Sequence, residues 1–137
     1  MKRARMVGKN VYLRGFEEDD ITEEYIDWVN NRKLIANLMT TFQPITRESA
    51  REYHRNNLDS NNIMFAICDK KTDKHIGNCR LVQIDWINRT CNYGRLIGHP
   101  DYQRSGYGSD ALIQLLRYAF HVIGINRVWS YAIETNK

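Results

Sequence analysis

A mixed α/β fold is predicted from three features of the sequence. Residues 63–97 contain three strand-like segments separated by short polar turns, which is typical of an antiparallel meander. From residue 107 onward, apolar residues recur at the spacing of an amphipathic helix. Residues 127–133 are then rich in β-branched and aromatic side chains, as expected of a strand. A strand, a helix and a strand in this order form a crossover with parallel strands, so the predicted sheet is mixed.

The first part of the chain is predicted to contribute one strand and two helices. Residues 10–16 alternate apolar and polar side chains, which indicates a half-buried strand. Residues 18–31 are expected to form a helix with an acidic start and one apolar face. Thr46 is the expected N-cap of a second helix that runs to about Leu58. Residues 1–8 are basic and are expected to be a solvated tail.

The remaining elements follow from apolar runs and turns. Six consecutive apolar residues at 63–68 predict a strand buried on both faces, and further strands are expected at 75–84 and 91–97. A loop at 98–108 leads into the long helix, and Gly124 suits the left-handed residue that ends it. The apolar stripe of this helix comprises Ala111, Leu112, Leu115, Leu116, Ala119, Phe120 and Ile123.

Composition limits the classes of function. The length of 137 residues suits a single domain spanning 1–137, and no apolar run approaches the about 20 residues that cross a bilayer. The net charge of +4 is spread along the chain without a nucleic-acid-binding signature, so it indicates a mild attraction for anions. Cys68, Cys79 and Cys91 lie in apolar segments without metal-ligand spacing, which predicts buried, reduced thiols, a cytoplasmic location and no metal site.

The segment from Gly98 to Ser109 is where chemistry is expected. A strand ends, the backbone turns, and a helix begins at Gly106 and Gly108, so an anion can approach the first-turn N–H groups closely. Several such groups at the positive end of a helix suit a pyrophosphate, and Arg104 adds positive charge. A plain glycine-containing connection is the alternative. The patterns of a P-loop and of a dinucleotide-binding loop are both absent.

The sequence QRSGYG at 103–108 matches the Q/R-x-x-G-x-G/A pattern of the GNAT superfamily of N-acetyltransferases, and the flanking residues 96–102 are similar to the family's fourth strand and the loop after it. The opening at 12–14, with the acidic run and residues 28–30, resembles the branch of ribosomal-protein alanine and sugar-nucleotide N-acetyltransferases. The similarity covers most of residues 9–136. The resemblance implies an acyl-CoA N-acyltransferase fold that transfers an acetyl group from acetyl-CoA to an amine.

The resemblance also implies roles for individual residues. The loop would hold the CoA pyrophosphate through Gln103, Arg104, Ser105, Gly106, Tyr107, Gly108 and Ser109. The strand end at Leu96, Ile97 and Gly98 would pair with the pantetheine arm, and an unpaired amide there would polarise the thioester carbonyl. Asn136 matches an asparagine that contacts the cofactor in relatives.

The proton acceptor is left open by the sequence. Many relatives carry a glutamate as base where this chain has Asn92, and an amide cannot take a proton at neutral pH. Tyr93 and His99 are the alternatives, unless water carries the proton away. Relatives take their acid from a helix after the fifth strand. The chain ends at Lys137, so the last helix and strand of the fold are expected to be missing, and the strand edge left exposed invites association, for example as a homodimer.

The expected partner is a small-molecule or peptide amine. An aminosugar nucleotide, a protein N-terminus, a polyamine and an antibiotic are all compatible with the sequence, and the basic charge slightly favours an anionic acceptor. Phe42, Gln43 and Trp86 are candidates for contact with it. Because Asn92 stands in the usual base position, a non-catalytic acyl-CoA-binding module is the second hypothesis. A nucleic-acid-binding domain ranks last.

Overall fold

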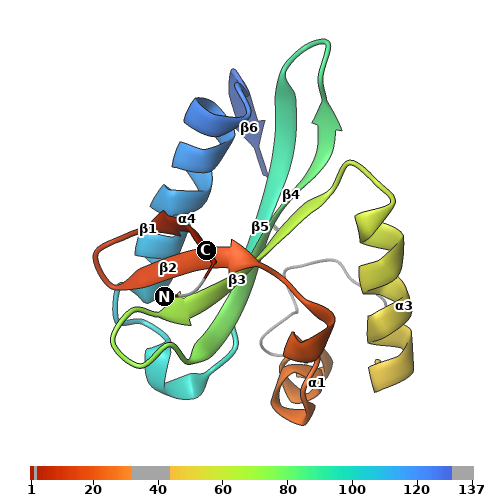
Figure 1. Ribbon diagram of the computed structural model, residues 1–137, viewed down its shortest axis with the longest axis vertical. Helices are drawn as coiled ribbons and strands as arrows, with labels where there is room; N and C mark the ends of the chain where they lie inside the picture. Colours follow the sequence, from red (N-terminus) through yellow and green to blue (C-terminus); the bar gives the residue numbers. More distant parts are fainter. Residues whose placement is uncertain (2, 32–43, 131–137) are drawn as a thin grey trace.

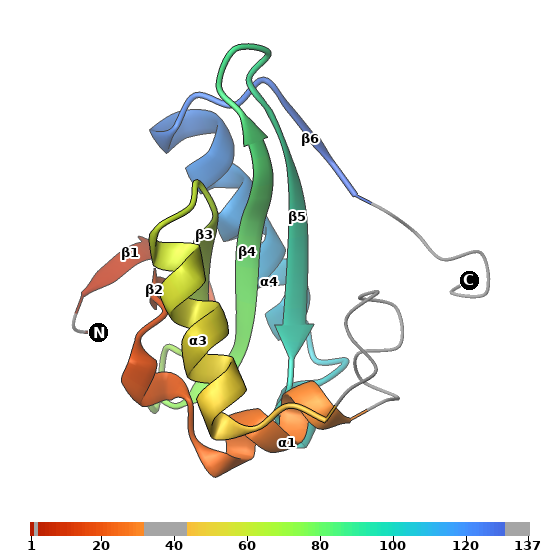
Figure 2. The same cartoon turned by 90° about the vertical axis from the view of Figure 1, so that its right-hand side faces the viewer.

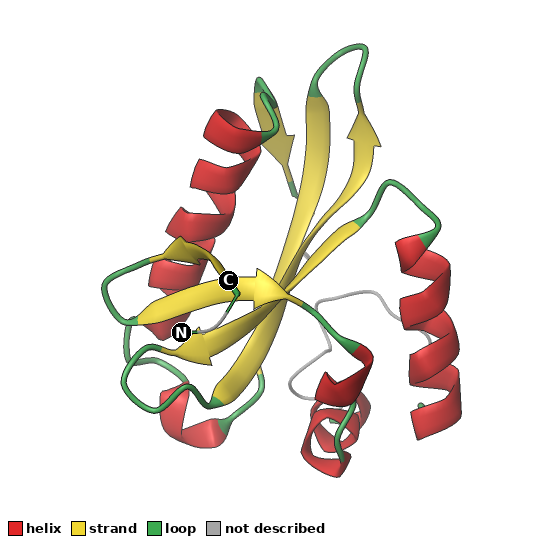
Figure 3. Ribbon diagram, viewed as in Figure 1, coloured by secondary structure: helices red, strands yellow, loops and turns green. Residues whose placement is uncertain are grey.

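The computed structural model describes residues 1, 3–31 and 44–130, and six strands of this part form one sheet in the order β1-β2-β3-β4-β5-β6 (Figures 1 and 3). The strands are β1 (Ala4–Val7), β2 (Val11–Gly15), β3 (Ile63–Asp69), β4 (His75–Asp85), β5 (Thr90–Ile97) and β6 (Arg127–Trp129). Neighbouring strands are antiparallel except β5 and β6, which are parallel. The predicted mixed sheet is therefore confirmed.

Helices cover both faces of this sheet. The elements are η1 (Glu18–Asp20), α1 (Glu23–Asn30), α3 (Arg47–Leu58), η2 (Pro100–Tyr102) and α4 (Tyr107–Arg117), followed by a π-helical turn at Tyr118–Val122. Helix α4 lies on one face, and α1 and α3 lie on the other (Figure 2). The predicted cap of α3 is confirmed, because the Thr46 hydroxyl accepts a hydrogen bond from the Ser49 N–H.

Two apolar cores result, one on each face. The core under α4 comprises Val11, Leu13, Phe65, Ile67, Ile76, Cys79, Leu81, Cys91, Ala111, Leu115, Ala119 and Ile125. The core under α1 and α3 comprises Tyr12, Phe16, Ile21, Tyr25, Trp28, Ala50, Ala66 and Cys68. Strand β3 supplies residues to both cores, which confirms that it is buried on both faces.

Two expectations for the N-terminal part are wrong. Residues 4–7 are strand β1 rather than a solvated tail, because they pair with β2 and alternate between half-buried and exposed. The first α-helix begins at Glu23 rather than at residue 18, because Thr22 caps it through a hydrogen bond from the Tyr25 N–H. The acidic residues before it form the separate turn η1.

The π-helical turn corrects the predicted stripe of the long helix. It inserts an extra residue into the turn, since the Ile123 N–H reaches back to the Tyr118 carbonyl. This rotation leaves Phe120 exposed and places the Tyr118 ring against Phe65, with centroids 4.9 Å apart. Gly124 has a φ of 73° and ends the helix as predicted.

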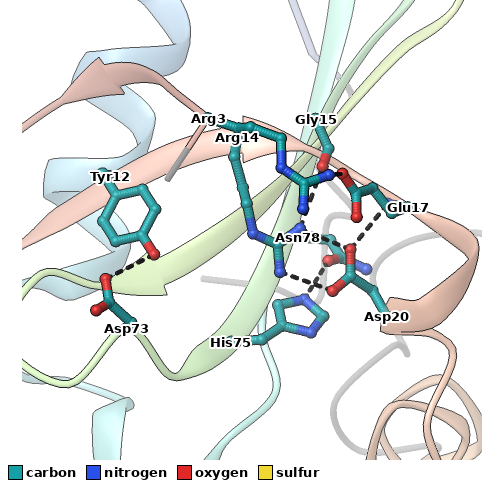
Figure 4. Close-up of polar contacts among 9 residues, drawn as sticks. All are labelled: Arg3, Tyr12, Arg14, Gly15, Glu17, Asp20, Asp73, His75 and Asn78. Carbon is teal, nitrogen blue, oxygen red and sulfur yellow. Dashed lines mark hydrogen bonds and ion pairs between the residues drawn. The ribbon is translucent and has the colours of Figure 1, made fainter. Parts of the chain in front are cut away.

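A buried ion pair sets the start of α1 against the sheet (Figure 4). The Arg14 guanidinium donates to both carboxylate oxygens of Asp20, at 2.7 and 2.8 Å, and the Glu17 N–H donates to the same carboxylate at 2.8 Å. Burial pushes the pKa of Asp20 upward, but these hydrogen bonds outweigh burial and hold the pKa below its ordinary value. The pair therefore stays charged at neutral pH and fixes the direction in which α1 leaves β2.

The turn between β1 and β2 is anchored on α4. The Asp110 carboxylate, in the first turn of α4, accepts hydrogen bonds from the backbone N–H groups of Asn10 and Val11 at 2.8 and 3.0 Å. Gly8 gives the carboxylate room, because a Cβ there would lie 2.6 Å from its oxygens. This contact holds the start of α4 in place beneath the sheet.

The three cysteines are free and buried, as predicted. Burial raises the pKa of each thiol, so they are unreactive at neutral pH. Among residues 1, 3–31 and 44–130, no group of three His, Cys, Asp or Glu side chains could hold a metal ion. In the same ranges, every helix is too short or too polar to span a bilayer.

Candidate active site

The connection from β5 to α4 is held by a tyrosine. The Tyr102 hydroxyl donates a 2.6 Å hydrogen bond to Asp69 at the end of β3, and its ring stands edge-on to the rings of His99 and Tyr107. Burial raises the pKa of Asp69, but the bonds from Tyr102 and from the Lys71 N–H outweigh it and hold the pKa below its ordinary value. The loop is thus tied to the sheet by a charged acceptor, which fixes where α4 begins.

The first turn of α4 presents unpartnered amides to solvent. Gly106 is the N-cap with a φ of 87°, it is exposed, and it offers no side-chain cap. The first helical hydrogen bond runs from the Asp110 N–H to the Gly106 carbonyl. Within the described residues, the N–H groups of Tyr107, Gly108 and Ser109 therefore have no acceptor, as at any uncapped helix start. These donors can bind an anion.

Cationic and polar side chains surround this turn. Arg104 is exposed and has a left-handed φ of 60°, and the Ser105 hydroxyl bonds back to the Tyr102 carbonyl at 3.1 Å. Arg95, which projects from β5, donates a hydrogen bond to the Gly108 carbonyl. The Arg95 guanidinium and the positive end of α4 repel each other when no anion is present. A bound anion would be attracted to both. Gln103 donates to the Ile97 carbonyl at 3.0 Å and links the loop to the strand.

The backbone of β5 has one side directed away from β4. The Gly98 N–H donates to the Ile76 carbonyl at 2.9 Å, which makes these two residues a hydrogen-bonded antiparallel pair. Because such pairs alternate, Leu96 also faces β4, whereas Arg95 and Ile97 direct their N–H groups to the opposite side. In the described part of the chain, β6 pairs only with Thr90, Cys91 and Asn92.

The three predicted strand-end residues therefore differ in what their amides can do. Gly98 is not an unpaired amide, since its N–H is engaged with β4, and Leu96 faces the same way. Of the three, only the Ile97 N–H points away from β4. At this position β5 has already passed the residues that pair with β6. The backbone of Gly98 instead lies under Trp28 of α1, because a Cβ on Gly98 would be 2.0 Å from the indole.

The polar atoms of the three candidate catalytic residues are mostly engaged. The Asn92 oxygen accepts from the Tyr93 N–H at 2.8 Å, and its nitrogen donates to Gln83 at 3.3 Å. Tyr93 packs against the core under α4. The His99 Nδ1 accepts from the Asp101 N–H at 3.2 Å, so the neutral ring carries its hydrogen on Nε2.

A carboxylate lies close to His99. Glu24 of α1 has an oxygen 3.9 Å from the His99 Nε2, and its side chain is 49% exposed. It therefore stands beside the end of β5 with room for water around it. Glu24 belongs to the first turn of α1, where an acidic residue is explained by the helix dipole alone, and this is why sequence analysis did not single it out.

The other sequence candidates do not gather here. Asn136, Phe42 and Gln43 lie outside the described residues. Trp86 is 49% exposed, and it follows directly after β4, in the turn before β5, whereas the loop discussed above follows the other end of β5 (Figure 1). Arg95 was also missed, because the alternation of β5 gives no sign that its side chain meets the start of α4.

Comparisons with known proteins agree with this geometry. The family described as an acetyltransferase (GNAT) domain matches residues 10–137. A search of curated proteins gives no match. The spermidine N-acetyltransferase of Vibrio cholerae, solved with CoA and spermine, is 20% identical to this chain with a TM-score of 0.83. The match covers 93% of this chain and 73% of that protein. A GNAT-family acetyltransferase of Bacillus anthracis is 19% identical with a TM-score of 0.78, and the match covers 96% of this chain and 75% of that protein.

Proposed function

Because the chain belongs to the acetyltransferase (GNAT) domain family, we propose that it transfers an acetyl group from acetyl-CoA to a primary amine at the junction of β5 and α4. The observation that carries this proposal is the uncapped first turn of α4 beside the side of β5 that, within the described residues, has no partner strand beyond Asn92. Acetyl-CoA is the co-substrate, and its pyrophosphate would accept hydrogen bonds from Tyr107, Gly108 and Ser109.

The pantetheine arm then has a defined path. Its amides would pair with Arg95 and Ile97, whose backbone groups point away from β4. The thioester carbonyl would accept from the Ile97 N–H, which stabilises the negative charge that develops on that oxygen during attack. As the amine nitrogen forms its bond to the acetyl carbon, the carbon–sulfur bond breaks and CoA leaves as a thiolate, which takes up a proton from water.

We place the proton acceptor at Glu24. The attacking amine must lose a proton, which the Asn92 amide cannot take, and the His99 Nδ1 already accepts a hydrogen bond from the Asp101 N–H. The Glu24 carboxylate lies at the end of β5 and can take the proton through a water molecule. The His99 Nε2–H, between that carboxylate and the strand end, would orient the water.

The acceptor is a primary amine. The resemblance of the sequence favours aminosugar nucleotides and protein N-termini, whereas spermine in the solved Vibrio cholerae complex adds polyamines to the classes to be tested. The free, buried cysteines support a reducing compartment, and we place the protein in the cytoplasm.

The proposal is tested by following acetyl-CoA and product by mass spectrometry with a panel of these amines. Glu24→Gln is expected to lower kcat about 100-fold or more, the usual contribution of a general base, while leaving acetyl-CoA affinity unchanged. Glu23→Gln, at the exposed neighbouring position of α1, is the matched control and should keep kcat within about twofold.

Two results would contradict parts of the proposal. Equal kcat for the two glutamate variants would remove Glu24 from the mechanism. Binding of acetyl-CoA without transfer to any amine would instead favour a non-catalytic acyl-CoA-binding module, an alternative that the engaged Asn92 carboxamide supports.

A further inference from the structure

An arginine that forms no ion pair with the described residues lies on the face of the sheet opposite α4. Arg80 is in β4 and is half-buried, and its guanidinium donates a 2.8 Å hydrogen bond to the hydroxyl of Tyr53 on α3. No carboxylate of the described residues forms an ion pair with it. Outside those residues the sequence holds a single acidic residue, Glu134. A guanidinium without a counter-ion is free to form a charged hydrogen bond with an anionic ligand.

The surroundings of Arg80 keep its guanidinium accessible. Arg80 stands opposite Gly94 of β5, and a Cβ on Gly94 would lie 3.2 Å from the Arg80 Nε. The missing side chain therefore lets the arginine lie flat across β5. Tyr53 occupies a single one of its five N–H donors, so the remaining donors can bind a carboxylate or a phosphate in a bidentate manner.

The position of Arg80 relative to the thioester suits an acceptor. Gly94 precedes Ile97 by three residues along β5, which corresponds to about 10 Å in an extended strand. Helix α4 covers the other face, so an amine reaches the thioester from the side of α1 and α3 (Figure 2). Half-buried residues of β4 and β5 face that side, and we call them the β4–β5 surface: Arg80, Val82, Asn92, Gly94 and Leu96.

From this geometry we infer that the amine acceptor carries a negatively charged group, a phosphate or a carboxylate, which binds Arg80 on the β4–β5 surface while the amine reaches the thioester beside Ile97. The inference rests on the proposed function and narrows it. It disfavours a polycation such as spermidine, because an unpaired guanidinium repels it. Tyr53 acts as a positioning residue that holds the guanidinium over Gly94.

The test compares kcat/KM for amines that differ in one group. Glucosamine 6-phosphate is compared with glucosamine to test for recognition of a phosphate. Glycylglycine is compared with glycylglycine amide to test for recognition of a carboxylate. Spermidine is the polycationic amine in the panel. We expect the anionic member of one pair to exceed its neutral partner about 10- to 100-fold, mostly through KM, as a charged hydrogen bond allows. The pair that shows the difference identifies the group.

Variants then assign the preference to Arg80. Arg80→Gln should remove it by raising KM for the anionic amine to that of its neutral partner, whereas Arg80→Lys should keep part of it. Arg51→Gln is the control, because it changes the net charge by the same amount at an exposed position of α3. It should keep the full preference for the anionic amine. Thermal unfolding and acetyl-CoA affinity show whether each variant is folded. If Arg80→Gln fails to fold, the role of Arg80 is tested with Arg80→Lys and Tyr53→Phe instead. Each of these variants should raise KM for the anionic amine and not for the neutral one.

The outcomes separate the two proposals. Equal rates for anionic and neutral amines, a preference for spermidine, or an anionic preference that survives Arg80→Gln would overturn this inference and leave acetyl transfer intact. Failure of acetyl-CoA to bind would refute the proposed function, and the inference would fall with it.

Discussion

Replacing Gly98 by alanine is expected to lower the free energy of unfolding by about 3 kcal/mol, the upper end of the usual cost of overpacking. The added Cβ would lie 2.0 Å from the Trp28 indole, a distance at which neither group can remain in place. Trp28 is 5% exposed and packs edge-on against His75, so it has little room to move. Thermal unfolding should show a loss of roughly 10 °C for a domain of this size.

Two further variants isolate the steric cause. Gly15→Ala adds the same methyl group at a strand glycine with no heavy atom within 4 Å of the new Cβ, and its effect should stay within about 0.5 kcal/mol. In a Trp28→Leu background, the cost of Gly98→Ala should fall below about 1 kcal/mol, because the smaller side chain leaves space. An undiminished cost in that background would show that the contact with Trp28 is not its origin.

Introducing aspartate at Gly106 is expected to weaken acetyl-CoA binding at least about 100-fold. A carboxylate at this N-cap would stand within a few ångströms of the pyrophosphate, and repulsion at that range is worth about 3 kcal/mol or more at the edge of a protein. Isothermal titration calorimetry of acetyl-CoA measures the affinity. No heavy atom lies within 4 Å of a Cβ at this position, but the φ of 87° strains any side chain there, so thermal unfolding must show that the variant is folded.

Gly106→Asn is the matched control for this experiment. Asparagine has the same shape as aspartate and tolerates the left-handed backbone at a φ of 87°, but it carries no charge. It should therefore bind acetyl-CoA within about tenfold of the wild type. If the two variants bind equally well, the pyrophosphate does not lie at Gly106 and the role of the helix start is refuted.

The sequence allowed prediction of those features that depend on residues close together in the chain. The Thr46 cap, the buried strand at 63–68 and the turn at Gly106 each follow from a local pattern of polarity or conformational freedom. The order of these elements was enough to predict the mixed sheet with its parallel last crossover. The position of the turn at Gly106 relative to β5 follows from the same order.

Contacts between distant segments could not be predicted. Trp28 over Gly98, Glu24 beside His99 and Tyr53 against Arg80 each join elements that are not neighbours in the sequence. Their side-chain types also have simpler local explanations, such as core packing, the helix dipole or exposure to solvent. The strand at residues 4–7 was missed because its stability comes from pairing with β2, not from its own basic sequence.

The position of the CoA pyrophosphate on the protein can be observed directly by NMR. In a ¹⁵N-labelled sample of this 16.2 kDa chain, titration with CoA should shift the backbone amide resonances of Tyr107, Gly108 and Ser109 first, together with those of Arg95 and Ile97. The amides of Arg80, Val82 and Asn92 should respond only when an amine is added. Shifts confined to another part of the molecule, or none at saturating CoA, would contradict the assignment of the start of α4 as the cofactor site.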